Sequence, residues 1–236
     1  EDVDLVAHTF FTAKQELAMQ VRCLKDDLAF TLGNGEPLSR RLVHVLNYLR
    51  ITYLAGDFGP ADRALEQGLA ERGLLDRLQR VDHQLAHVAS AVFTSGFDRC
   101  LGVSLDGYGS GAAGSVYSWE AGKLSLLGRI PFPHSLGAFY QRATTALGFK
   151  ALRHEGKVLG LAAFGDPAIL HDRVRARFED HGDFFRFKSA HDILIERGLA
   201  RRHRREDVAA AYQQVLEEVT TRFLKPFLEH TGHTRV

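Results

Sequence analysis

The chain has 236 residues, with a hydrophobic fraction of 45% and a charged fraction of 25%, the proportions of an ordinary soluble globular protein. The formal net charge of +1 argues neither for nor against nucleic-acid binding, and no apolar run reaches the roughly 18 residues that a membrane-spanning helix needs. The two cysteines, Cys23 and Cys100, match no metal or redox spacing, and the acidic start of the chain does not resemble a signal peptide, so a reduced, cytoplasmic protein is expected.

The N-terminal part predicts one short strand followed by helices. Residues 3–10 (VDLVAHTF) form a compact apolar run that is typical of a buried strand. From there to about Gly96 the pattern is mostly helical. Asp82 is predicted to be the N-cap of a helix, because the apolar residues after it have amphipathic spacing. These apolar positions are Leu85, Val88, Ala89, Val92 and Phe93.

The period then changes, and three short strands are expected. They cover residues 101–105 (LGVSL), 115–120 (SVYSWE) and 124–130, joined by a glycine-rich turn at 106–114 and a tight turn at 121–123. Short consecutive strands with tight turns between them are typical of an antiparallel meander.

Helices are expected after the meander. One covers about 135–147 with Ser135 as its N-cap, a second covers roughly 156–164, and a long amphipathic helix covers about 207–230 with a kink or interruption near Pro226. The order β-β-β-α predicts an α/β protein. Each lobe of the actin/sugar-kinase fold starts in this way, although the pattern alone leaves that fold as one of several α/β options.

A pair of histidines provides the first candidate site. His83 and His87 stand four residues apart, so a helix places both imidazoles on one face, opposite the apolar stripe. Two such nitrogens can bind one divalent metal; a solvated helix face is the alternative. The zinc-protease motif is excluded because Gln84 cannot act as its general base. Asp106, at the end of a predicted strand, is the natural third ligand, and iron(II), manganese or zinc would fit this set.

The glycine-rich turn is the second candidate site. Gly107, Gly109, Gly111 and Gly114 let the backbone tighten and bring its N–H groups close to an anion such as a phosphate. A flexible hairpin loop is the alternative. The sequence matches neither the Walker A pattern nor a dinucleotide fingerprint, and its Asp-Gly start fits the phosphate hairpin of the actin/sugar-kinase fold better.

Five motifs occur in an order and spacing that resemble one known family. They are HQLAH (83–87), LDG (105–107), PHSLG (133–137), LGF (147–149) and EGKVLGLAAFGD (155–166). Together they resemble the O-carbamoyltransferases of antibiotic tailoring and nodulation-factor synthesis, over roughly residues 80–168. The resemblance implies an incomplete actin/sugar-kinase-like (ASKHA) fold, with a mixed antiparallel and parallel sheet flanked by helices, and a catalytic domain similar to that of the tRNA threonylcarbamoyl transferases.

The resemblance also implies a reaction and a site. A carboxy-terminal domain would turn carbamoyl phosphate and ATP into carbamoyl-adenylate, and the present domain would transfer the carbamoyl group to the hydroxyl of a small molecule, with neither a membrane nor a nucleic acid as partner. His83, His87 and Asp106 match the family's catalytic and metal positions. The positions that match its nucleotide and phosphate side are Gly107, Tyr108, Gly109, Ser110, His134, Glu155, Lys157 and Gly160.

The sequence departs from the family in several places. The family's early strands, the glycine-rich strand expected after Val236 and the carbamoyl-phosphate domain are missing, Asp82 replaces a histidine, and Gly156 replaces an aromatic residue. We therefore expect residues 1–98 to be a mostly helical remnant of a first lobe that carries the histidine helix, and 99–236 to be a second lobe. The chain is expected to be inactive alone. The alternatives are a related tRNA or hydrogenase-maturation carbamoyl transferase, and a truncated nucleotide-binding scaffold.

Overall fold

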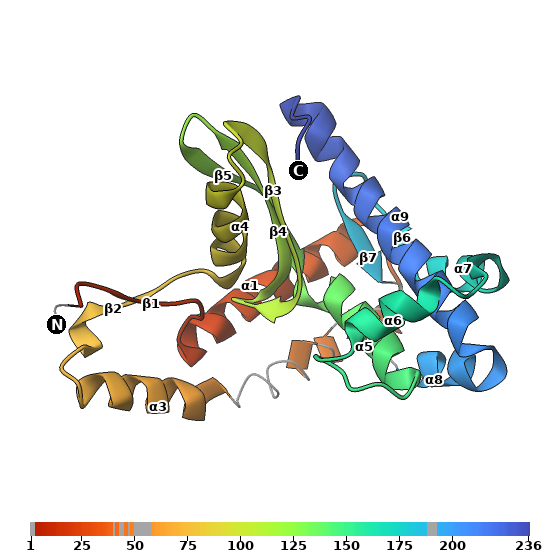
Figure 1. Cartoon of the computed structure of the whole chain (residues 1–236), viewed down its shortest axis with the longest axis horizontal. Coiled ribbons are helices and arrows are strands. Elements are labelled where there is room, and N and C mark those ends of the chain that lie inside the picture. Colours follow the sequence, from red (N-terminus) through yellow and green to blue (C-terminus); the bar gives the residue numbers. More distant parts are fainter. Residues whose placement is uncertain (1–2, 40, 43–44, 47, 50–57, 188–192) are drawn as a thin grey trace.

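The computed structural model describes residues 3–39, 41–42, 45–46, 48–49, 58–187 and 193–236. Helices surround three small sheets, one parallel and two antiparallel, so the described part of the chain is a mixed α/β protein as predicted (Figure 1). Among the described residues, no helix combines the length and the apolar character needed to cross a bilayer.

The N-terminal part contains a parallel strand pair. Strand β1 (Val6–His8) lies beside β2 (Leu78–Arg80), and the long connection between them contains helices α1 (Ala13–Gly33) and α3 (Phe58–Ala70). The prediction that helix dominates up to Gly96 missed β2, because three residues are too few to establish a period of two. Residues 50–57, which belong to the same predicted helical stretch, lie outside the described residues.

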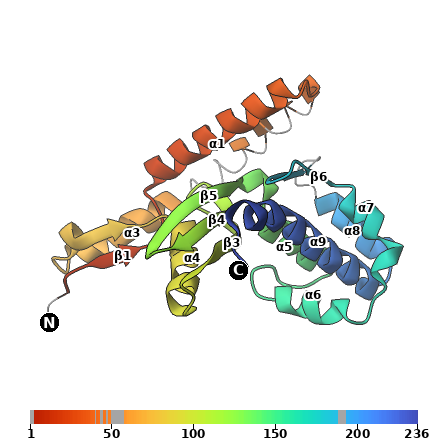
Figure 2. The ribbon, with the colours of Figure 1, turned by 90° about the horizontal axis from the view of Figure 1, so that it is seen from above.

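Helix α1 begins where the sequence supplies a complete capping box. The Thr12 side chain accepts a hydrogen bond from the backbone N–H of Gln15, and the Gln15 side chain accepts one from the backbone N–H of Thr12. Figure 2 shows α1 running along one side of the molecule, with the central sheet between it and the helix labelled α6 (Glu155–Ala162).

The central sheet is the predicted antiparallel meander. It has the order β3-β4-β5, with β3 at Arg99–Gly109, β4 at Ala112–Glu120 and β5 at Lys123–Pro131. The predicted long glycine-rich turn was wrong in extent, because β3 continues through the glycines to Gly109 and leaves only two turn residues. These are Ser110 and Gly111, both with positive φ (52° and 78°), the conformation that tight hairpins require.

Helix α4 (His83–Thr94) covers one face of this sheet. Asp82 caps it as predicted, accepting a hydrogen bond from the backbone N–H of Leu85 at 2.9 Å. The helix packs very closely on β3: a Cβ at Gly102 would lie 2.4 Å from a methyl carbon of Val88. Phe93 was predicted to face the core and does not, since it is 64% exposed near the last turn of the helix.

The main core lies on the other face of the sheet. Leu101 faces this core, while its neighbour Gly102 faces α4, as alternate residues of a strand must. Helices α5 (Leu136–Ala146) and α9 (Arg205–Thr231) supply much of the core, for example the stacked rings of Phe139 and Tyr212. The predicted N-cap of α5 at residue 135 is confirmed. Helix α9 continues through Pro226, so the predicted interruption there was wrong.

The smaller elements complete this side of the molecule. Helix α7 (His171–Arg175) and the α6 helix pack against α9, and α8 (Ile193–Arg202) packs against α5. The third sheet is the hairpin of β6 (Phe178–Asp180) and β7 (Phe185–Phe187).

Candidate metal centre

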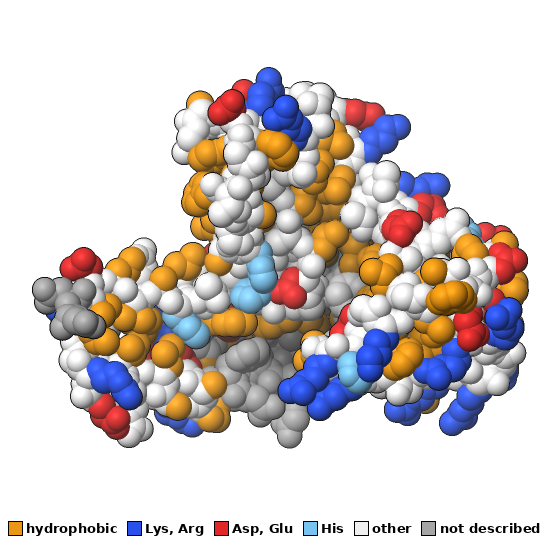
Figure 3. Space-filling model, viewed as in Figure 1, with side chains coloured by type: hydrophobic (Ala, Val, Ile, Leu, Met, Phe, Trp, Pro, Cys, Tyr) orange, Lys and Arg blue, Asp and Glu red, His pale blue; other side chains and the backbone are white. Residues whose placement is uncertain are grey.

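Two helix-borne imidazoles and one strand-borne carboxylate converge at the surface between α4 and the end of β3. The His83 Nε2 atom lies 2.8 Å from Asp106 Oδ2 and 3.0 Å from His87 Nε2, and the third side of the triangle, from His87 Nε2 to Asp106 Oδ2, is 3.8 Å. The His87 side chain is 54% exposed and that of Asp106 33% exposed, so the cluster is open to ligands. In the space-filling view, histidine and acidic side chains meet at the surface in this part of the molecule (Figure 3).

The surroundings of His83 leave its ring between two acceptors. Its Nδ1 atom lies 3.2 Å from the backbone oxygen of Thr9, and its Nε2 atom faces the Asp106 carboxylate. The hydrogen bond to Asp106 raises the pKa of His83 above its usual value, although partial burial opposes this. A carbonyl oxygen can only accept, so Nδ1 carries a proton, and Nε2 must carry either a second proton or a metal to face a carboxylate.

The surroundings of Asp106 favour its ionised carboxylate form. Burial alone would raise the pKa of Asp106, but hydrogen bonds from His83 and from the backbone N–H of Gly107 bring it below its usual value. The Gly107 N–H donates to Oδ1 at 2.6 Å, which leaves Oδ2 directed at the imidazoles.

The start of α5 fixes the backbone of Asp106. The Ser135 hydroxyl donates to the Asp106 carbonyl oxygen at 2.7 Å and accepts from the N–H of Ala138 at 2.9 Å, so one side chain links the helix start to the metal cluster. Gly137 lies directly against the same peptide, because a Cβ there would come within 2.6 Å of the Asp106 carbonyl carbon and oxygen.

Residues Gly109 and Ser110, at the turn between β3 and β4, position His83. A Cβ at Gly109 would lie 2.1 Å from His83 Cδ2, so the imidazole rests directly on the glycine. The hydroxyl of Ser110 accepts a hydrogen bond from the backbone N–H of His83 at 3.0 Å. Further along the helix, buried Gln84 accepts a hydrogen bond from the Ser104 hydroxyl at 2.7 Å, which anchors the first turn of α4 to β3.

These distances fit one shared cation. Two ligands about 2.1 Å from a metal and about 90–110° apart are separated by roughly 3.0–3.4 Å. Two edges of the observed triangle, 2.8 and 3.0 Å, are near this range, and the third, 3.8 Å, is longer. Three acceptor atoms pointing at one another are stabilised when a positive charge lies between them. Two imidazoles with one carboxylate suit iron(II), manganese or zinc. The predicted ligand set of His83, His87 and Asp106 is therefore brought together in the fold.

The predicted phosphate hairpin, residues 107–110, adjoins this cluster, but its larger side chains have structural partners. The Tyr108 hydroxyl donates to Glu16 of α1 at 2.7 Å and accepts from Gln20 at 2.8 Å. Ser110 is fully buried against α4. Gly107 uses its N–H for the carboxylate of the preceding aspartate. The phosphate role of residues 107–110 stays a prediction.

His134 does not join the cluster. It is fully buried, its Nδ1 atom accepts a hydrogen bond from the backbone N–H of Phe187 at 3.2 Å, and its Nε2 atom lies 3.5 Å from Asp27 of α1. In this conformation the imidazole links α1, β7 and the start of α5. The expected contact with a nucleotide stays a prediction and would need this side chain to become accessible.

The remaining predicted nucleotide residues, Glu155, Lys157 and Gly160, lie on α6. The Glu155 side chain accepts from the backbone N–H of Leu152 at 2.7 Å, the Lys157 ammonium lies 3.4 Å from His154 Nε2, and Gly160 is exposed with no atom near its Cβ position. Within the described residues, none of these contacts reaches the metal cluster. Their nucleotide role is untested.

Three residues contact the candidate ligands in ways that the sequence did not indicate. Ser135 was predicted only as a helix cap, Gly109 as a position on the phosphate side, and Gly137 only as part of a motif. A sequence signal existed, because a serine N-cap and two glycines stand beside the proposed ligands, but their partners become visible only when the hairpin and α5 meet in space.

Comparison with known proteins gives the class of protein. Residues 62–235, which include His83, His87 and Asp106, match the family described as "Carbamoyltransferase N-terminus". The chain belongs to this family.

Individual relatives narrow the comparison. The chain is 30% identical to the nodulation protein NolNO of Sinorhizobium fredii over 191 residues, 73% of this chain and 28% of that protein. It is 30% identical to the nodulation protein NolO of Bradyrhizobium diazoefficiens over 169 residues, 66% of this chain and 30% of that protein. It is also 30% identical to the uncharacterised protein sll1178 of Synechocystis over 171 residues, 64% of this chain and 28% of that protein. The chain thus spans less than a third of the length of these relatives.

Proposed function

We propose that this chain is part of the catalytic domain of an O-carbamoyltransferase. This domain transfers a carbamoyl group from carbamoyl-adenylate to the hydroxyl of a small molecule. The observation that carries the proposal is the convergence of His83, His87 and Asp106 within a chain of the carbamoyltransferase family. The match to two nodulation proteins supports a small-molecule acceptor over a tRNA or a protein.

The proposed fold is the actin/sugar-kinase type. The support is the antiparallel β3-β4-β5 meander followed by α5, and the hairpin turn at Ser110 and Gly111 beside the candidate metal centre. On this proposal, residues 1–98 come from the first lobe and residues 99–236 from the second.

The residues of the chain have separable roles in this proposal. His83, His87 and Asp106 would hold a divalent cation, which when bound supplies a positive charge that stabilises the developing negative charge on carbamoyl and phosphate oxygens. The Thr9 carbonyl oxygen fixes the proton of His83 on Nδ1, so that Nε2 faces the cation site. His87, the most exposed ligand, would border the bound substrate.

The substrates and the adenylate-forming step of the proposed reaction are not represented by any contact described above. ATP and carbamoyl phosphate as substrates, and a further domain that makes the adenylate, are inferred from the family resemblance. The helix start that bears Glu155 and Lys157 is proposed to face the nucleotide. Because the chain covers less than a third of its relatives, we propose that it is inactive without the rest of the protein.

The test uses the full-length protein that contains this chain. It is supplied with ATP, carbamoyl phosphate labelled on carbon, manganese and a panel of sugars and polyols, and label transfer to the hydroxyl compounds is measured. We expect the His83→Ala and His87→Ala variants to lose transfer, and the release of AMP that accompanies it, at least about 100-fold, while the release of pyrophosphate that accompanies adenylate formation persists. His230→Ala, an exposed histidine near the end of α9, is the matched control. Unchanged transfer by both cluster variants would refute the proposal.

A further inference from the structure

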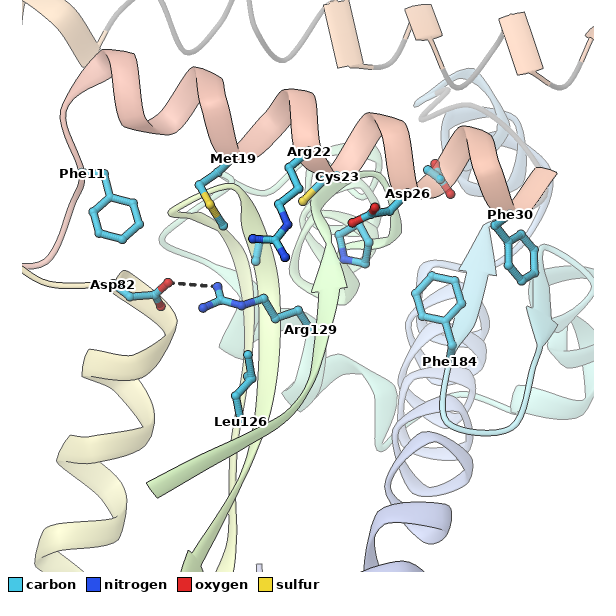
Figure 4. Close-up of a pocket in the computed structure, with 13 residues that line it drawn as sticks. Phe11, Met19, Arg22, Cys23, Asp26, Phe30, Asp82, Leu126, Arg129 and Phe184 are labelled. Carbon is cyan, nitrogen blue, oxygen red and sulfur yellow. Dashed lines mark ion pairs between the residues drawn. The ribbon is translucent and has the colours of Figure 1, made fainter. Parts of the chain in front are cut away.

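A second cavity lies between α1 and the central sheet, and none of the three metal-cluster residues lines it (Figure 4). Its volume of about 590 Å³ falls within the range of roughly 300–1,000 Å³ that is usual for small-molecule sites. Apolar side chains form much of its wall. They are Phe11, Met19, Phe30, Leu126, Pro131 and Phe184.

Most of the charges at this cavity are already neutralised within the protein. Asp82 pairs with Arg129 through contacts of 2.9 Å, and both residues line the cavity. Asp27, which also lines it, pairs with buried Arg186 at 2.6 Å. These charged groups need no ligand to balance them.

Two charged side chains of α1 at this cavity have no ion-pair partner in the described part of the chain. Arg22 and Asp26 stand one helical turn apart, and Figure 4 shows both side chains directed from α1 into the cavity. In the described part of the chain, neither makes an ion pair or a side-chain hydrogen bond. The spacing of four residues would allow them to pair with each other, and they do not. The cavity therefore offers one free cation and one free anion beside an apolar wall.

We propose that this cavity binds a small zwitterionic molecule with an apolar body. The anionic group of the ligand pairs with Arg22, and its ammonium group pairs with Asp26. The apolar body packs toward Phe30 and Phe184, whose rings lie at the far end of the cavity in Figure 4. This site does not depend on the proposed carbamoyl transfer.

Charge balance decides between ligand classes. A wholly apolar ligand would remove water from Arg22 and Asp26 without giving either a partner, which is unfavourable. A simple anion would satisfy Arg22 but would bring a like charge near Asp26. A zwitterion satisfies both groups, and its apolar body covers the hydrophobic wall.

Three dansyl compounds test the proposal because they share one fluorescent apolar body. Nε-dansyl-lysine is a zwitterion, dansylglycine an anion and dansylamide neutral. Fluorescence titration of the protein should give saturable binding of one molecule, with Nε-dansyl-lysine tighter than dansylamide by at least about tenfold. Equal affinity for the three compounds, or binding without saturation, would overturn the proposal.

Variants assign the two charges separately. Arg22→Ala should weaken Nε-dansyl-lysine and dansylglycine at least about fivefold and leave dansylamide unchanged, whereas Asp26→Asn should weaken Nε-dansyl-lysine alone. Lys25→Ala, an exposed charge on the same helix outside the cavity, should change none of the three. Leu126→Trp, which fills the cavity from β5, should weaken all three. Unchanged binding in the Arg22 and Asp26 variants, with circular dichroism confirming the fold, contradicts the proposal.

Discussion

Replacing Gly109 with alanine would put a methyl carbon where the His83 imidazole now lies. The added Cβ would be 2.1 Å from His83 Cδ2 and 2.3 Å from Cγ, whereas non-bonded carbons need about 3.5 Å. Gly109 does not have a positive φ, so its backbone accepts alanine without strain and the effect falls on the imidazole.

The magnitude follows from the overlap. To restore a normal contact, the ring must move by about 1.4 Å or more, while metal–ligand distances tolerate changes of only about 0.2 Å. His83 would therefore be lost as a ligand. We expect Gly109→Ala to lower the affinity for manganese or zinc by at least about 100-fold, and to destabilise the fold by about 1–3 kcal/mol through overpacking.

The assay is a calorimetric titration of metal into the wild-type and variant proteins, with thermal unfolding measured on the same samples. Gly107→Ala is the matched control, because it lies two residues away in the same strand, has no positive φ and has no atom within 4 Å of its Cβ position. It should bind metal almost as the wild type does. Metal affinity in Gly109→Ala equal to that of the wild type would refute the assignment of His83 as a ligand.

Substitutions at three further positions have defined outcomes. Ser135→Ala should lower the free energy of unfolding in urea by about 1 kcal/mol and weaken metal binding, whereas Ser135→Thr should keep the wild-type stability and metal affinity. Equal behaviour of the two variants would argue against a role of the Ser135 hydroxyl in positioning Asp106. Asp82→Ala should cost about 1–2 kcal/mol and Asp82→Asn less, because asparagine keeps the helix cap and loses only the ion pair. Hydrogen bonds to Asp172 and Glu218 raise the pKa of His171, so the stability that protonated His171 contributes is present below pH about 6.5 and is lost as the pH rises through the raised pKa. The His171→Gln variant should not show this pH-dependent loss of stability in thermal unfolding. A variant with the same pH profile of stability as the wild type would contradict this assignment.

The sequence predicted those parts of the fold whose signals are local. The strand meander consists of short apolar runs separated by turn residues, and both Asp82 and Ser135 proved to be helix caps. The three-residue strand β2 has too few residues to show a period, and it exists because β1 lies beside it. Phe93 fits the apolar spacing of α4, but one edge contact with the Trp119 ring of β4 leaves it 64% exposed.

The sequence predicted that His83, His87 and Asp106 lie together, but not the residues that contact them. Two histidines four residues apart must share a helix face, and Asp106, predicted at the end of a strand but found three residues before the end of β3, meets them. The contact of His83 with Gly109 depends on tertiary packing, which no spacing in the sequence encodes. The burial of His134 also depends on tertiary packing, because α1 and β7 meet this side chain at the start of α5.

The central claim is that one cation is held by His83, His87 and Asp106. Crystals of the protein grown with manganese, with diffraction recorded on both sides of the manganese absorption edge, test it most directly. The account predicts one strong anomalous peak within about 2.0–2.3 Å of the two Nε2 atoms and the Asp106 carboxylate. Crystals with manganese present and no peak at this position, or with the peak at other residues, would contradict it.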